Sequence, residues 1–275
     1  MPLNINGNII SSNVTNSSGV IQNYPTINQN GLVLWLDAGR SQSYYDVNYY
    51  DCGYGCQYYA SNPGCTNCNS QWTDLSSSAC RGQFINGPTF SFNNGGAIVF
   101  DGVNDYVQIN NFTFNSKPSA QITCDAWIKP TRASVGTGTI RGGVISATSN
   151  MYFGVIDSID GGATMSLHWA NNTNNGSQRP GSVAGSIPNN AWSYIAGTYD
   201  GSTSRAYING VEVWSAGQTG TVPDSTYVVG TYGAGLTDGV HNFNGHIAIA
   251  RIYRRGLSGA EVLQNYNAER GRFGL

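Results

Sequence analysis

The sequence has few charged residues. Only 10% of its 275 residues are Asp, Glu, Lys or Arg, and 13 basic residues against 15 acidic ones give a formal net charge of −2. A chain with so little excess charge has no electrostatic attraction to DNA, RNA or an anionic membrane, so we expect no nucleic-acid partner. Solubility must come from amides and hydroxyls instead, a composition typical of turn-rich β structure.

Long apolar runs are also missing. No segment approaches the roughly 20 apolar residues of a membrane-spanning helix, so we expect no membrane insertion. The start, MPLNINGNII, has no basic segment followed by an apolar stretch and therefore predicts no secretion signal. Hydrophobic residues still make up 40% of the chain, which excludes an intrinsically disordered protein.

Glutamate is scarce, and this bears on catalysis. Glycosidases place two carboxyl groups across the scissile bond. Of the three Glu, Glu212 follows a predicted turn, and Glu261 and Glu269 lie in a predicted terminal helix. The closest Asp pair, Asp157 and Asp160, lies in VIDSIDGG, whose glycines favour a loop. No histidine accompanies a G-x-S-x-G nucleophile motif. We therefore predict that the protein is not an enzyme.

The apolar residues occur in short segments that turn residues separate. Ten segments read as strands: AIVF (97–100), DYVQI (105–109), QITCDAWIKP (121–130), GGVISA (142–147), MYFGVI (151–156), ATMSLHWA (163–170), AWSYIAGTYD (191–200), SRAYI (204–208), VEVW (211–214) and HIAIARIY (246–253). Ten short strands at this spacing predict an all-β sandwich. Asn209-Gly210 and Asp200-Gly201 predict tight hairpins that join three of these strands.

The two ends of the chain differ from this pattern. Ser258 and Glu261 have the spacing of a helix capping box, which predicts one short helix over about 259–269. Residues 1–30 are rich in Asn and Ser and have no sustained apolar period, so we predict an extended N-terminal arm. The arm is either disordered or docked on a neighbouring subunit. The folded domain is predicted over 31–275.

A Cys- and Tyr-rich insert is predicted at about 43–70. Its four cysteines, Cys52, Cys56, Cys65 and Cys68, have a spacing that suits a tetrathiolate zinc site and equally suits two disulfides. In either case the cysteines would order the insert and carry no chemistry. Cys124 lies inside an apolar strand and is expected to be a free core thiol.

Several motifs stand in a recognisable order along the chain. They are LVLWLDAG (32–39), QWTDLS (71–76), FDGVNDYV (100–107), ITCDAWIKP (122–130), AWSYIAGTYDG (191–201), AYINGVEV (206–213) and HIAIARIYRRGLSGAEV (246–262). This order resembles the laminin-G-like group of the concanavalin A-like lectin/glucanase superfold. The resemblance implies two antiparallel sheets packed as a jelly-roll sandwich. The ending QNYNAERGRFGL (264–275) further resembles such domains in virion structural proteins of tailed bacteriophages.

The resemblance also implies where ligands would bind. Many relatives hold Ca²⁺ with the help of an Asp in the last long strand, where this chain has Ala248. This departure argues against calcium, and Asp37, Asp101 and Asp105 remain the candidate oxygen ligands.

A polar segment, HWANNTNNGSQRP (168–180), is the candidate sugar site. Trp169 would stack on a sugar ring, and the amides of Asn171, Asn172, Asn174 and Asn175 would hydrogen-bond to its hydroxyls. The alternative is a long polar loop whose Trp packs in the core.

Together these observations predict a non-enzymatic phage virion structural protein, a capsid decoration or a fibre. It would be made in the host cytoplasm and lie on the virion surface. Its partners would be other virion proteins, contacted through the arm, a second copy of itself, and a host-surface glycan bound weakly. The alternative is a dedicated carbohydrate-binding adhesin or module.

Overall fold

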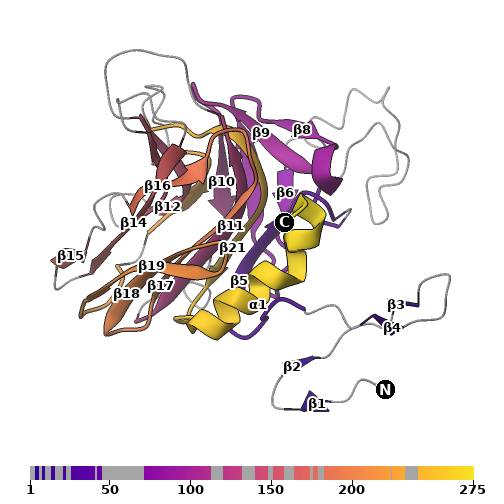
Figure 1. Ribbon diagram of the computed structural model, residues 1–275. Coiled ribbons are helices and arrows are strands. Elements are labelled where there is room, and N and C mark those ends of the chain that lie inside the picture. The colour runs from indigo at the N-terminus through magenta and orange to yellow at the C-terminus, as the bar shows by residue number, and fades with distance from the viewer. Residues whose placement is uncertain are drawn as a thin grey trace, which may run out of the picture.

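The computed structural model describes residues 26–40, 42–44, 71–112, 120–131, 140–147, 151–157, 164–173, 176–178, 183–223, 225–232 and 241–275. Before residue 26 it describes four two-residue strands, β1 (Asn4–Ile5), β2 (Asn8–Ile9), β3 (Val14–Thr15) and β4 (Ile21–Gln22). The predicted sandwich is confirmed: two antiparallel sheets lie face to face, and one helix lies near the C-terminus (Figure 1).

Sheet A has eight strands in the described residues. Its spatial order is β19-β18-β17-β11-β21-β9-β8, and β5 continues beside β21. These strands are β5 (Leu32–Asp37), β8 (Thr89–Ser91), β9 (Ala97–Asp101), β11 (Ile122–Pro130), β17 (Ser193–Tyr199), β18 (Thr203–Ile208), β19 (Val211–Gly217) and β21 (Asn244–Tyr253). The short 3-10 helix η1 (Asn93–Gly95) lies between β8 and β9.

Sheet B has nine strands in the described residues, in the order β15-β14-β13-β12-β20-β10-β7-β6, and β16 also pairs with β14. The strands are β6 (Gln71–Thr73), β7 (Arg81–Ile85), β10 (Tyr106–Asn110), β12 (Ile140–Ala147), β13 (Met151–Asp157), β14 (Thr164–Thr173), β15 (Gly176–Gln178), β16 (Val183–Pro188) and β20 (Tyr227–Val229). Side chains of a strand point alternately to the two faces of its sheet. The inner faces of the two sheets therefore form one shared core, which includes Leu34, Phe153 and Ile195.

The predicted hairpins are confirmed. Asn209 and Gly210 have φ angles of 50° and 81°, and Ile208 pairs with Val211 across them, as a two-residue Asn-Gly turn requires. The strands β17, β18 and β19 therefore form a continuous antiparallel meander.

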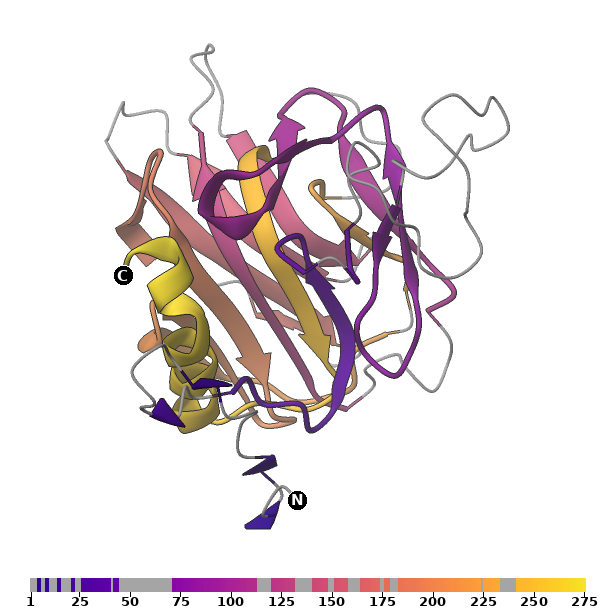
Figure 2. The ribbon, with the colours of Figure 1, turned by 90° about the vertical axis from the view of Figure 1, so that its right-hand side faces the viewer.

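The C-terminal helix α1 (Gly259–Glu269) lies against the outer face of sheet A (Figure 2). Its capping box is confirmed, because the Ser258 side chain accepts from the Glu261 N–H and the Glu261 side chain accepts from the Ser258 N–H. A second apolar cluster fills the space between sheet and helix, and Trp127 and Val262 lie in it, fully buried. The 3-10 helix η2 (Arg270–Phe273) follows α1 and adds Phe273 to this cluster.

Residues 26–30, here called the strap, lie along α1. The backbone oxygen of Thr26 accepts from the Gln264 side chain at 2.7 Å, and the Asn28 side chain donates to Glu261 at 2.7 Å. Ile27 is buried in the cluster beneath α1. The strap therefore packs as part of the sandwich, although the sequence analysis assigned it to the arm.

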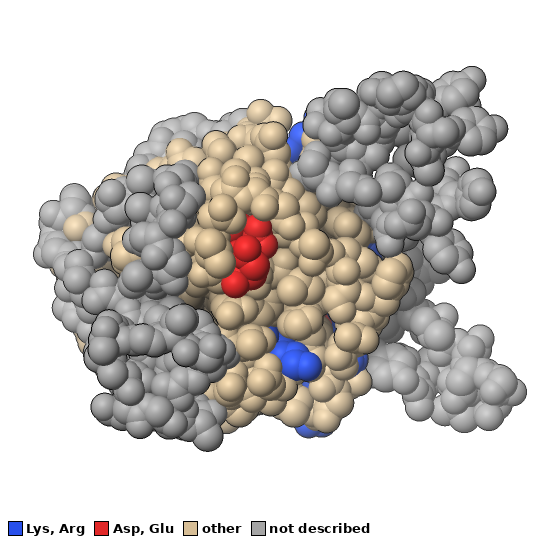
Figure 3. All heavy atoms as spheres, turned by 90° about the horizontal axis from the view of Figure 1, so that it is seen from above, with Lys and Arg blue, Asp and Glu red and all other residues tan. Residues whose placement is uncertain are grey.

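One face of the molecule carries little charge on its described residues. Where Figure 3 shows described residues on this face, most are neutral, with one compact acidic spot and a few Lys and Arg side chains. Within the described part of the chain, no helix has the length and apolar character needed to cross a membrane.

Candidate ligand-binding face

The outer face of sheet B, which points away from the core, carries a continuous row of cross-strand neighbours. Their pairings run from the border strand β6 across to β14. The row is Gln71, Gln83, Gln108, Val228, Ser146, Tyr152 and Ala170. Three neighbouring amides thus share one line, and neighbouring strands in a sheet lie about 4.8 Å apart. The rest of the row, from Val228 to Ala170, is buried.

The amide end of this row is open to solvent. Gln83 is exposed, and Gln71 and Gln108 are half-buried. The Asn110 side chain donates to the Gln83 side-chain oxygen at 3.3 Å, which extends the group by a fourth amide. Amides both donate and accept hydrogen bonds, so this surface matches the hydroxyl groups of a sugar.

The other end of the row carries clustered rings. Tyr152 lies 4.3 Å from His168 and 4.9 Å from Tyr232, measured between ring centroids, and Tyr232 stacks on His241 at 5.5 Å. Tyr152 is only 2% exposed, and its hydroxyl donates to the Val155 carbonyl oxygen at 3.2 Å. Tyr232 and His241 are half-buried and border the open surface.

A glycine allows these rings to approach sheet B. A Cβ on Gly143 would lie 2.3 Å from the backbone carbon of Thr231, so a larger residue there would push Thr231 and Tyr232 away. The Gly143 N–H donates to the His241 carbonyl oxygen at 3.3 Å, which fixes His241 at this point.

Two residues of the predicted sugar site, Trp169 and Asn171, are buried, and the structure corrects the prediction for them. Trp169 is 0% exposed, lies in the core between the sheets, and donates from its indole N–H to the Ser204 hydroxyl at 2.8 Å. Gly197 makes room for it, because a Cβ there would lie 2.4 Å from the indole ring. Asn171 is also 0% exposed. Asn172 belongs to β14, its side chain is outside the described residues, and so are Asn174 and Asn175.

The three candidate calcium ligands do not share one site. Asp37 pairs in register with Ile249 of β21, and Asp101 pairs with Asn244. Positions 244 and 249 are about 17 Å apart along a strand. Asp37 instead binds Arg272 at 2.7 Å. No group of three or more metal-binding side chains occurs among the described residues.

Asp101 and Asp105 form a turn. The Asp101 carboxylate accepts from the Val103 N–H at 2.7 Å, and the Asp105 carboxylate accepts from the Asp101 N–H at 3.1 Å. Burial raises the pKa of Asp105 and so disfavours its charged form. A calcium ligand would have to be a charged carboxylate.

The cysteines Cys52, Cys56, Cys65 and Cys68 lie outside the described residues. Cys80 and Cys124 are free and buried, as expected for Cys124. Burial raises the pKa of both thiols, that of Cys80 to about 12.

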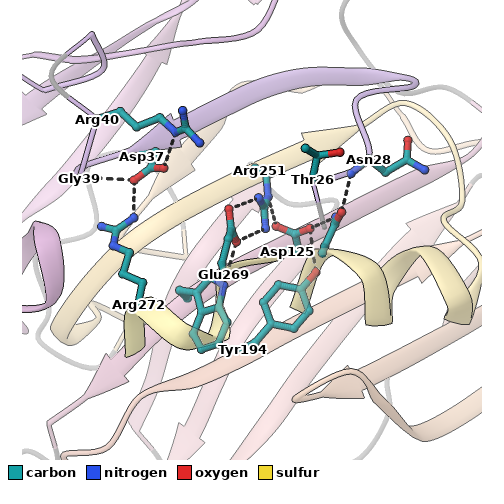
Figure 4. Close-up of polar contacts among 12 residues, drawn as sticks. Thr26, Asn28, Asp37, Gly39, Arg40, Asp125, Tyr194, Arg251, Glu269 and Arg272 are labelled. Atoms are coloured by element: carbon teal, nitrogen blue, oxygen red, sulfur yellow. Dashed lines mark hydrogen bonds and ion pairs between the residues drawn. The ribbon is translucent and has the colours of Figure 1, made fainter. Parts of the chain in front are cut away.

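A buried ionic network holds α1 to sheet A (Figure 4). Arg251, which is 0% exposed, donates to Asp125 at 2.6 Å and to both carboxylate oxygens of Glu269 at 2.8 and 3.0 Å. The Tyr194 hydroxyl donates to Asp125 at 2.9 Å. Burial raises the pKa of Glu269, and Arg251 opposes that shift. The helix covers these carboxylates, so the network serves to dock α1.

Sequence comparison decides the family. The family model of the concanavalin A-like lectin/glucanases superfamily matches residues 101–263, more than half of the chain. The chain belongs to this superfamily. Within it, sheet B and its outer face form one layer of the lectin-like sandwich, and α1 covers the other layer. No curated protein matches the chain by sequence.

Solved structures match the fold. The binding domain of Paraclostridial Mosquitocidal Protein 1 has a TM-score of 0.56 at 16% identity, covering 86% of this chain and 52% of that one. The receptor binding domain of botulinum neurotoxin D has a TM-score of 0.55 at 13% identity, with 86% and 52% covered. Domain 4 of AbnA, a GH43 extracellular arabinanase from Geobacillus stearothermophilus in complex with arabinotriose, has a TM-score of 0.45 at 21% identity, with 67% and 81% covered. The chain thus spans about half the length of the two toxin domains.

The amide row was not predicted from the sequence, although the position of Gln108 within its strand indicated it. In DYVQI, Gln108 alternates with Val107 and Ile109, both of which are buried in the core. A polar residue between two core residues of a strand must point to the opposite face of its sheet. The segment QWT around Gln71 was too short to read as a strand by itself. In RGQFI, around Gln83, Gly82 takes the inward position where an apolar residue would have signalled a strand.

Proposed function

We propose that this protein is a non-catalytic, lectin-like binding protein on the exterior of a virion, as a capsid decoration or fibre, and that it binds host-surface glycan weakly through the outer face of sheet B. The observation that carries the binding role is the row of Gln71, Gln83 and Gln108, which is partly open to solvent. The buried Val228 and Ser146 separate this row from the ring cluster. Such a row of amides offers paired donors and acceptors for sugar hydroxyls.

The placement of the carboxylates supports a non-catalytic role. Glycoside hydrolysis needs two carboxyl groups that reach a substrate from both sides. Asp125 and Glu269 are bound to Arg251 beneath α1, and Glu261 is bound to Arg255 at 2.7 Å. Each of these groups stabilises the fold and is turned away from the open face.

The virion assignment is supported by the resemblance of residues 264–275 to the ends of phage structural domains. The arm at residues 1–25 would attach the domain to other virion proteins or to a second copy. Imaging of the native particle with this chain located in it tests the assignment. Absence of the chain from purified particles would overturn it.

Glycan binding is tested with the double variant Gln83→Ala/Gln108→Ala on an array of host-envelope polysaccharides, followed by calorimetry on the best ligand. We expect at least a tenfold rise in Kd. Gln29→Ala, an exposed glutamine on the strap, is the matched control and should leave Kd unchanged. Equal binding by both variants would contradict the assigned face.

A dedicated adhesin is the second candidate, because the same open amide row would serve it. The two candidates differ in incorporation into virus particles, which can be measured. An adhesin should bind its glycan with the arm removed and should not be incorporated into particles. A virion protein should be incorporated, and should lose incorporation when residues 2–25 are deleted. A reducing-end release assay completes the comparison, and turnover would contradict both candidates.

A further inference from the structure

Strand β19 forms an open border of sheet A. It is seven residues long, and among the strands that the structure describes it pairs with β18 alone. Border strands present unpaired N–H and C=O groups, which proteins usually protect with Lys, Pro, very short strands or a covering element. The sequence VEVWSAG has neither Lys nor Pro, and Val211 is 64% exposed. On the opposite border, β8 has only three residues, and β5 is buried along its whole length. The β19 border is therefore suited to receive another strand.

The arm has the composition of such a strand. Residues 2–25 contain no Asp, Glu, Lys or Arg and include the β-branched residues Ile5, Ile9, Val14 and Ile21. Its described residues pair as β1 with β2 and as β3 with β4, in two-stranded sheets that join neither sheet A nor sheet B. Isolated two-stranded pairs are marginally stable in water, so the arm gains more by joining a larger sheet.

The arm leaves the domain beside the β19 border. Thr26 is hydrogen-bonded to Gln264 of α1, and the adjacent Leu263 packs so closely on the β18–β19 turn that a Cβ on Gly210 would lie 2.8 Å from it. Leu263 is itself 44% exposed. An extended segment of 24 residues reaches about 80 Å, more than three times the length of β19.

We propose that the arm of one molecule adds a strand to the β19 border of a second copy. The added strand pairs its backbone with β19, and apolar arm residues cover Val211 and Leu263. With two-fold symmetry each copy gives an arm and receives one, which closes the assembly as a dimer. The inference rests on the proposed assembly role of the arm and names its binding site.

The experiment compares four versions of the full chain by sedimentation velocity over a range of concentrations. The original protein should be a dimer, and deletion of residues 2–25 should give a monomer. Val211→Lys/Ser215→Lys places two lysines along the β19 border and should raise the dimer Kd at least tenfold. Thr89→Lys/Val103→Lys adds the same charge at exposed positions elsewhere and should leave the dimer intact.

A synthetic peptide of residues 2–25 separates the remaining outcomes. It should bind the deletion variant and fail to bind the deletion variant that also carries Val211→Lys/Ser215→Lys. A monomeric original protein at all concentrations would overturn the proposal. A dimer that needs the arm but tolerates the β19 lysines would overturn the β19 site while leaving the assembly role of the arm standing.

Discussion

The backbone N–H of Asn28 donates a hydrogen bond of 2.7 Å to the side-chain oxygen of Asn265, 237 positions further along the chain. The amide nitrogen of the same Asn265 donates to Asp125 at 3.0 Å and to the Tyr253 hydroxyl at 2.9 Å. One buried amide therefore joins the strap, the helix and sheet A, with all of its donors and its acceptor engaged.

Replacing Asn265 with Leu should lower the free energy of unfolding by about 2–4 kcal/mol, because Asp125 and the Asn28 N–H lose a partner in a buried environment. Gln264→Leu, one position away and half-buried, should cost less than about 1 kcal/mol, since its single partner is the Thr26 carbonyl oxygen near solvent. Urea titrations of both variants measure the difference. Equal losses would show that Asn265 has no special role.

Truncation should distinguish the arm from the strap. Deleting residues 2–25 should leave the thermal midpoint nearly unchanged, whereas deleting residues 2–30 should lower it by several degrees, because Ile27 and Asn28 leave the interface with α1. Differential scanning calorimetry on samples at equal concentration tests this. A similar fall in both variants would place the arm within the folded unit.

Trp169→Ala should destabilise the fold by about 3–5 kcal/mol, because it empties a site in the core and leaves the Ser204 hydroxyl without its indole partner. Phe92→Ala is the aromatic control: Phe92 is 69% exposed, so its removal should change stability by about 0.5 kcal/mol or less. Chemical denaturation of the two variants gives both numbers. A stable Trp169→Ala protein would contradict the buried position.

Acid should weaken the attachment of α1 and the strap. The Arg255 side chain lowers the pKa of Glu261 to about 2 from its usual 4.5, helped by the N–H and hydroxyl of Ser258. The unfolded chain therefore takes up this proton at a higher pH than the folded one. The stabilisation is complete above about pH 4.5 and is lost as the pH falls toward 2.

The pH dependence is measured by urea titration from pH 6 downward. Glu261→Gln should remove this contribution and flatten the profile between pH 4.5 and 2 relative to the original protein, while the other carboxyl groups act equally in both. Parallel profiles would show that Glu261 is not ion-paired in solution.

The four insert cysteines should act as one unit, through a metal or through disulfides. Because burial raises the pKa of Cys80 and Cys124, neither should react with a thiol reagent near pH 8 in the native protein. Native thiol counting should therefore give about zero, and metal analysis should decide between zinc and disulfides. Four freely reacting thiols without metal would contradict both versions. Chelation should restore all four only if zinc holds them.

Local signals predicted most of the fold. The Asn209-Gly210 turn and the Ser258 capping box depend on residues close in sequence, and both formed as expected. The strands Gln71–Thr73 and Tyr227–Val229 were missed because three residues are too few to show a period. They exist because longer neighbours in sheet B pair with them.

Long-range pairs explain the errors at the candidate sites. Nothing near Asp37 in the sequence indicates that Arg272, 235 positions away, neutralises it and occupies its oxygen. Trp169 was read together with the polar residues that follow it, although Met165, Leu167 and Trp169 alternate in the manner of a strand face that enters the core. This alternation favours the alternative in which Trp169 is a core residue.

The placement of the strap determines how the domain would respond to mechanical tension. A pull on residues 1–25 reaches the hydrogen bonds between the strap and α1 first, and then β5, whose residues pair with β21 inside sheet A. The force therefore enters sheet A through the pairing of β5 with β21, and the outer face of sheet B lies in the opposite layer. A domain held by its arm would therefore lose the hydrogen bonds between the strap and α1 before the outer face of sheet B is disturbed.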